Sequence, residues 1–105
     1  MRARILLVED APEIREVFTM LLEAEGAELA ARGDFDIVLT DLGLPDISGE
    51  MVIRHVLRNA PRRPRVVVLT GYDEPFTSRA REAGADVVLT KPVLWASLVD
   101  ELSAA

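Results

Sequence analysis

Three carboxylic acids, one hydroxyl and one amine occupy the positions where short apolar runs of the sequence end. These five residues are Glu9, Asp10, Asp41, Thr70 and Lys91. Three carboxylates that converge in one pocket repel one another unless a cation neutralises them. Oxygen ligands from carboxylates suit Mg²⁺, which keeps several waters and accepts a phosphate oxygen. An aspartate can also attack phosphorus and form an aspartyl phosphate, and an amine and a hydroxyl would then stabilise the added charge.

Each of these residues also has an ordinary structural interpretation. An aspartate after a strand, such as Asp41, is commonly a cap or a turn former. The pair Glu9–Asp10 fits the acidic start of a helix, and Thr70 fits a β-branched strand residue. Lys91 is harder to explain in this way, because it is the only lysine among twelve basic residues and precedes Pro92. A compact ammonium at a strand end indicates a specific point charge, so the five positions together favour one shared site.

Four apolar runs predict the strands that position these residues. The runs cover residues 5–8, 36–40, 66–70 and 86–90. They are rich in Val, Leu and Ile and show no polar alternation, which is typical of strands buried on both faces of a parallel sheet. In an open parallel α/β sheet, ligands bind beyond the carboxyl ends of the strands. The five polar residues are therefore expected at one shared edge.

Amphipathic segments between and after these runs predict four helices, within residues 11–26, 48–59, 74–84 and 93–105. The first segment has Pro12 in its first turn and Gly26 as a stop signal. Strands that alternate with helices predict βαβ units and a doubly wound parallel sheet with helices on both faces. The apolar stripe of the first helix consists of Ile14, Val17, Phe18, Leu21 and Leu22.

Size and composition restrict the class of function. The 105 residues suffice for one domain with a single core, spanning 1–105. A net charge of −6 argues against direct nucleic-acid binding, and the Arg-rich segment 58–65 is interpreted as a solvated loop. The lack of cysteine excludes disulfides and thiolate metal sites. No apolar run is long enough for a signal peptide or a membrane span, so the expected location is the cytoplasm, with no membrane partner.

Four segments, in their order and spacing, resemble the receiver domain of two-component response regulators. They read ILLVEDAPEIRE, DIVLTDLGLPDISG, VVVLTGYDEP and AREAGADVVLTKPV. The resemblance implies a flavodoxin-like α/β fold with strand order 2-1-3-4-5, and a signalling domain rather than an enzyme. It also implies that Asp41 accepts a phosphoryl group from a sensor histidine kinase or a phosphotransfer protein. The signal would then pass to an output domain or a downstream protein.

The same resemblance assigns roles to individual residues. Thr70 would be the switch hydroxyl, and Lys91 would pair with the phosphoryl group, with the Lys91–Pro92 peptide bond in the cis form. The Mg²⁺ ligands would be the side chains of Glu9, Asp10 and Asp41 and the main-chain carbonyl of Gly43.

The sequence departs from the family pattern at two places. The family usually has an aromatic residue three positions before its lysine, where this chain has Val88. Between Gly26 and Asp36, roughly a dozen residues of the family's second strand and second helix are missing, and a parallel strand with its return crossover needs about that many. The shortening predicts a four-stranded sheet with no parallel strand within residues 27–35.

A missing second strand has a consequence for assembly. The first strand would present an exposed apolar edge, and its helix would lead to the strand on the other side by a left-handed crossover, which is rare. Exchange of the first βα unit between two chains would resolve both problems. The sequence therefore predicts a swapped homodimer.

Two other functions compete with the phosphorylated switch. A haloacid dehalogenase-type phosphohydrolase would carry a second aspartate two residues after its nucleophile, and this position holds Gly43. A receiver-like module for interaction or assembly, which does not switch, is favoured by Val88 and by the shortened region.

Overall fold

Five parallel strands form one sheet in the order β2-β1-β3-β4-β5. The structure, a computed structural model, describes residues 1–31, 34–42 and 47–104, and at residues 41, 42 and 47–49 it describes the backbone alone. The strands are β1 (Arg4–Val8), β2 (Glu28–Leu29), β3 (Ile37–Leu42), β4 (Arg65–Thr70) and β5 (Val87–Thr90). The predicted doubly wound parallel sheet is confirmed.

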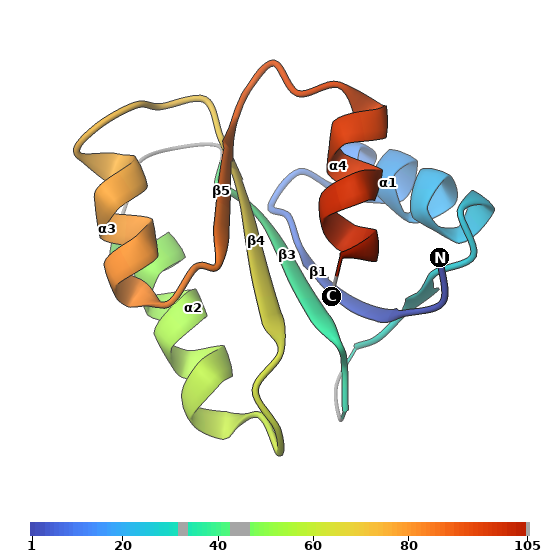
Figure 1. The fold of residues 1–105 in the computed structure, drawn as a ribbon, viewed down its shortest axis with the longest axis horizontal. Coiled ribbons are helices and arrows are strands. Elements are labelled where there is room, and N and C mark those ends of the chain that lie inside the picture. Colours follow the sequence, from blue (N-terminus) through green and yellow to red (C-terminus); the bar gives the residue numbers. More distant parts are fainter. Residues whose placement is uncertain (32–33, 43–46, 105) are drawn as a thin grey trace.

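Two helices cover each face of the sheet. In Figure 1, α1 (Pro12–Ala24) and α4 (Trp95–Ser103) lie on one side of the sheet. The other side carries α2 (Ile47–Asn59) and α3 (Phe76–Ala83). Successive strand residues point to opposite faces, so neighbouring residues of β3 serve different cores. Val38 belongs to the core under α2 and α3, and Leu39 to the core under α1 and α4, which explains the absence of polar alternation.

Helix α1 begins and ends where the sequence predicts, but its apolar stripe is only half buried. Pro12 is its first residue, and Gly26 follows its end with a φ of 94° that favours glycine. Leu22 is fully buried, and Phe18 packs against the same core. The rest of the stripe, Val17 among it, stays largely exposed. The short β2 strand offers too little surface to cover a stripe of this width.

The prediction of a four-stranded sheet with no strand in residues 27–35 was wrong. Strand β2 pairs in parallel with β1, with Glu28 opposite Arg4 and Leu29 opposite Ile5. Main-chain bonds from Glu28 N to Ala3 O (2.9 Å) and from Ala30 N to Ile5 O (2.8 Å) hold it there. Two residues suffice because only the start of β1 is paired on this side.

The return from β2 to β3 is also shorter than expected, for a geometric reason. Leu29 and Ile37 lie opposite the same residue, Ile5, on its two sides. The chain therefore crosses about 10 Å, or two strand spacings, and does not have to travel back along a strand. The described residues between β2 and β3 form no helix, so the family's second helix is the missing element. Ala30 and Phe35 are buried instead, in the core under α2 and α3.

The presence of β2 removes the argument for a swapped homodimer. The strand lies on the outer side of β1 and receives the chain directly from α1. No crossover from α1 to β3 is needed, and the outer edge of β1 is covered at Arg4 and Ile5. The prediction of an exchanged dimer rested on the absence of this strand.

Asp36 joins the return segment to the start of the sheet, and its ionisation should contribute to stability. The amide of Arg4 donates to Asp36 Oδ2 (2.9 Å), and Arg62 Nη2 donates to Asp36 Oδ1 (2.7 Å). These two bonds lower the pKa of Asp36 from its ordinary value of 3.8. The bond from the Arg4 amide has the larger effect. A carboxyl whose pKa is lower in the folded state adds stability above the unfolded pKa and loses it as the pH falls through the folded pKa.

We therefore expect the free energy of unfolding to fall as the pH is lowered below about 4, and to fall less in Asp36→Asn. At neutral pH this variant should be less stable by about 1 kcal/mol, because hydrogen bonds to a charged acceptor are weakened. Urea unfolding at pH 7 and at lower pH measures both effects. Asp100→Asn is the matched control, since Asp100 is an exposed acid on α4 and Asp34 itself pairs with Arg62. An equal acid-induced loss in Asp36→Asn and wild type would contradict this role.

Candidate functional site

The carboxyl ends of four strands meet at one edge of the sheet, as the sequence predicts. Val8 pairs with Thr40 across β1 and β3, and Thr70 pairs with Thr90 across β4 and β5. Asp41 pairs with Leu69, the residue before Thr70. Each of the five polar residues therefore lies at, or within two residues of, the end of its strand. The register brings their main chains to a common edge.

Glu9 and Asp10 are held by the turn that joins β1 to α1. The amide of Ala11 donates to Glu9 Oε1 (3.0 Å), and Arg15 Nη1 donates to the Glu9 carbonyl (2.9 Å). Asp10 is exposed, whereas Glu9 is half-buried. Both bonds fix the backbone on which the two acids stand. The anchoring role of Arg15 was not predicted, because it depends on the place of this residue in the first turn of α1.

Thr70 and Lys91 are linked through the main chain. The Lys91 amide donates to the Thr70 carbonyl (2.7 Å), so the two strand ends are tied together. The buried Thr70 hydroxyl accepts a bond from the Tyr72 amide (3.1 Å) and keeps its own proton to donate. The Lys91–Pro92 peptide bond is cis, as predicted.

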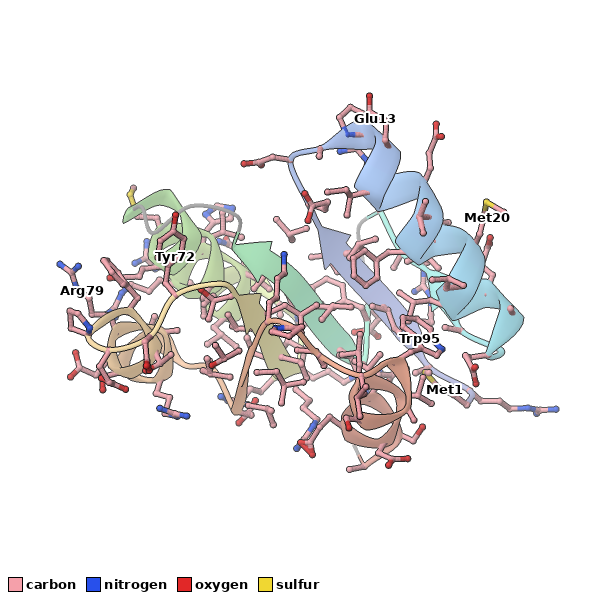
Figure 2. The ribbon with its side chains drawn as sticks, turned by 90° about the horizontal axis from the view of Figure 1, so that it is seen from above. Met1, Glu13, Met20, Tyr72, Arg79 and Trp95 are labelled. Atoms are coloured by element: carbon pink, nitrogen blue, oxygen red, sulfur yellow. The ribbon has the colours of Figure 1, made fainter. Side chains whose placement is uncertain are left out.

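Val88, which replaces the family's aromatic residue, lies opposite Val68 on β4. Its half-buried side chain packs against the core under α2 and α3. Tyr72, the one tyrosine of the sequence, forms an edge-to-face ring pair with Phe76, with centroids 5.7 Å apart. Figure 2 shows Tyr72 on the side of the molecule that carries α2 and α3.

Asp41 lies in β3, but its side chain is outside the described part of the structure. Gly43, whose main-chain carbonyl the resemblance assigns to the metal, is also outside the described residues. Among the side chains that are described, no three Asp, Glu, His or Cys residues could hold a metal ion together. Because Asp41 does not belong to that set, the predicted triad of acids stays a prediction. The donors available at this edge, carboxylates next to one another after β1, fit Mg²⁺ by their chemistry.

The family model for the response regulator receiver domain matches residues 5–103. This chain belongs to that family. Receiver domains are signalling domains of two-component systems, so the predicted family and class of function are confirmed.

Two curated relatives and one solved structure illustrate the similarity. The response regulator protein PilR of Pseudomonas aeruginosa is 37% identical, over 88% of this chain and 23% of PilR. The DNA-binding response regulator MtrA of Mycolicibacterium smegmatis is 35% identical, over 99% of this chain and 50% of MtrA. The solved structure is the receiver domain of the sensor histidine kinase PA1611 from Pseudomonas aeruginosa, with a magnesium ion in its active-site cleft. Its sequence is 25% identical to this chain, and the two structures superpose with a TM-score of 0.79. The match covers 99% of this chain and 97% of that domain.

The chain spans half or less of the length of these two curated relatives. The alignment with MtrA runs over 116 residues, more than this chain contains, so MtrA has residues without a counterpart here. This agrees with a shortened member of the family. None of the helices in the described part of the chain combines the length and apolarity needed to cross a bilayer.

Proposed function

We propose that residues 1–105 act as one cytoplasmic receiver domain that takes a phosphoryl group onto Asp41 from a histidine kinase or a phosphotransfer protein. The observation that carries the proposal is the register. It supports a common site for Asp41, Thr70 and Lys91, because β3, β4 and β5 end level with one another. Family membership supports the same reaction, which response regulators use to change state.

In the proposed reaction, a carboxylate oxygen of Asp41 forms a bond to phosphorus while the bond from phosphorus to the donor's imidazole nitrogen breaks. Mg²⁺ held by Glu9, Asp10, Asp41 and the Gly43 carbonyl would neutralise charge on the phosphoryl oxygens. The Lys91 ammonium pairs with the same group as a point charge. The Thr70 hydroxyl, whose lone pair faces the Tyr72 amide, directs its proton towards the new anion.

Acetyl phosphate provides the direct test, because a small donor needs no protein partner. The chain is incubated with acetyl phosphate and Mg²⁺, and its intact mass is measured. A gain of one phosphoryl group supports the proposal. A protein that stays unmodified, while a known receiver domain is modified under the same conditions, contradicts it.

The exposed side of α1 supports a docking surface for the phosphoryl donor. Four large apolar side chains on this helix are exposed, at fractions of 43–69%: Ile14, Val17, Met20 and Leu21. The helix begins at Pro12, two residues after Asp10. In Figure 2 Met20 points away from the sheet on the outer side of α1. Contiguous exposed apolar residues commonly mark a protein interface, and this one adjoins the edge where the phosphoryl group must arrive.

Replacing Val17 by Glu should slow phosphoryl transfer from a kinase by about tenfold or more, since a charge at the centre of an apolar contact costs at least 1.4 kcal/mol. Uptake from acetyl phosphate should not change. The measurement uses an autophosphorylated histidine kinase that modifies the wild-type chain. Met51→Glu is the matched control, because Met51 is equally exposed but lies on α2, across the sheet. Equal slowing in both variants would argue against a surface on α1.

A second candidate function is a receiver that accepts the phosphoryl group without switching. The small Val88 side chain, packed in the core under α2 and α3, favours it. Beryllofluoride with Mg²⁺ imitates the phosphoryl group and separates the two functions. Changes in amide resonances that extend along β5 and α3 support the switch, and changes confined to the strand ends support the alternative.

A further inference from the structure

Hydrogen bonds from Arg15 close the turn that joins β1 to α1. Arg15 Nη1 donates to the Glu9 carbonyl (2.9 Å), and the Arg15 amide donates to the Ala11 carbonyl (2.9 Å). Within the same turn, the Ala11 amide donates to Glu9 Oε1 (3.0 Å). Figure 2 shows Glu13, in the first turn of α1, beyond the end of β1. The side chain of Arg15 therefore ties the helix to the strand end that carries the first acids of the site.

The group that accepts the bond from the guanidinium is a main-chain carbonyl, which carries no net charge. This carbonyl belongs to the peptide group that joins Glu9 to Asp10. Because a peptide group is planar, a bond to its oxygen also sets the direction of the chain on both sides. The bond from Arg15 therefore holds the backbone of both acids at once.

The charge of Arg15 and its hydrogen bond have opposite effects on a metal ion at these acids. A guanidinium close to the site repels a divalent cation, so by charge alone its removal would tighten Mg²⁺ binding. Arg15 is exposed, however, and salt screens exposed charges strongly. Mg²⁺ demands near-ideal octahedral geometry, and groups that orient metal ligands typically change the affinity by roughly 10- to 100-fold. Placement of the acids should therefore outweigh repulsion.

We propose that Arg15 is a positioning residue of the Mg²⁺ site, which raises the affinity for the metal although both carry positive charge. This inference rests on the proposed function, because it takes Glu9 and Asp10 as ligands of Mg²⁺. Arg15 itself contacts neither the metal nor the phosphoryl group. It acts through the peptide group between the two acids, so α1 contributes to the metal site as well as to the fold.

Arg15→Met removes the guanidinium and keeps most of the aliphatic stem. We expect this variant to bind Mg²⁺ about tenfold more weakly than wild type, because the backbone of the two acids is no longer held. Titration of Mg²⁺ into ¹⁵N-labelled protein, followed at the amides of residues 9–11, measures the affinity without any reaction. An affinity equal to that of wild type, or the tighter binding that charge alone would cause, overturns the proposal.

Two further variants separate placement from charge. Arg15→Lys keeps the positive charge on a shorter stem without the planar fork, so it should bind Mg²⁺ about threefold more weakly than wild type. A lysine variant that binds like wild type overturns the proposal, also where Arg15→Met does not fold. Arg54→Met is the matched control, since Arg54 is an exposed arginine on α2, across the sheet. Its affinity should change about twofold or less, and a loss equal to that of Arg15→Met overturns the proposal.

Phosphoryl uptake from acetyl phosphate, measured over a range of Mg²⁺ concentrations, separates metal binding from the transfer step. In Arg15→Met the Mg²⁺ concentration that gives half the maximal rate should rise about tenfold, while the maximal rate stays within about twofold of wild type. A lower maximal rate with an unchanged half-saturating concentration would place Arg15 in the transfer step and overturn the proposal. If wild type binds Mg²⁺ but takes up no phosphoryl group, the proposed function fails, while the Mg²⁺ titrations still decide the role of Arg15.

Discussion

Asp41→Asn should abolish phosphoryl uptake from acetyl phosphate. The amide oxygen that replaces the carboxylate is neutral and a poor nucleophile, and the substitution also removes one of the three acids proposed to hold Mg²⁺. The side chain keeps nearly the same size and shape, so the fold should be retained. Intact mass after incubation with acetyl phosphate and Mg²⁺ measures the effect. We expect the wild-type chain to gain one phosphoryl group and the variant to gain none.

Asp73→Asn is the matched control for this experiment. Asp73 is an exposed aspartate just beyond the end of β4, three residues after Thr70. The substitution Asp73→Asn removes one negative charge near the strand ends and leaves the proposed phosphoryl acceptor, Asp41, unchanged. Phosphorylation should proceed in this variant as in wild type. A phosphorylated Asp41→Asn protein would show that a different side chain at the edge accepts the phosphoryl group.

The main strands were predictable because each is an apolar run with polar residues at its end. The predicted runs agree with β1, β3, β4 and β5 to within two residues at either end. The boundaries of α1 were predictable for a similar reason, since Pro12 and Gly26 act locally on the backbone. These signals lie in neighbouring residues and do not depend on the rest of the chain.

Strand β2 could not be found in this way, because tertiary contacts make it. Glu28 and Leu29 form no apolar run, and their strand conformation is set by main-chain bonds to Ala3 and Ile5. The estimate that a strand and its return need about a dozen residues assumed a full-length strand. Pairing at two residues only removes that requirement.

The site was predictable as a set of positions and not as a geometry. That Glu9, Thr70 and Lys91 stand at strand ends follows from where the apolar runs end. That the Lys91 amide binds the Thr70 carbonyl, and that Arg15 holds the Glu9 carbonyl, depends on backbone paths that residue types do not determine. The exposure of Val17 on α1 was also not predictable. An amphipathic pattern shows which side of a helix is apolar, but not how much of that side the rest of the protein covers.

Asp10→Asn should remove Mg²⁺ binding and phosphoryl uptake together. Asp10 is exposed at the end of β1, beside the half-buried Glu9. Mg²⁺ binds through few direct carboxylate ligands, so the loss of one charged ligand should weaken its affinity by at least about tenfold, or 1.4 kcal/mol. Titration of Mg²⁺ into ¹⁵N-labelled protein, followed at the amides of residues 9–11, measures the affinity.

A charge-matched control separates ligation of the metal from the general field of the acids. Glu13→Gln removes one negative charge from the first turn of α1, three residues after Asp10, without removing a proposed ligand. It should weaken Mg²⁺ binding about twofold or less, because exposed charges are strongly screened by salt. Equal losses in the two variants would mean that Asp10 acts only through its charge. Uptake that survives in Asp10→Asn would show that the metal assignment is wrong.

The stability of Asp10→Asn separates a role in the metal site from a role in the fold. The free energy of unfolding should not fall in this variant, since removing one of several neighbouring carboxylates relieves their repulsion when no metal is bound. A variant that is folded and as stable as wild type, yet takes up neither Mg²⁺ nor a phosphoryl group, would assign Asp10 to the metal rather than to the fold.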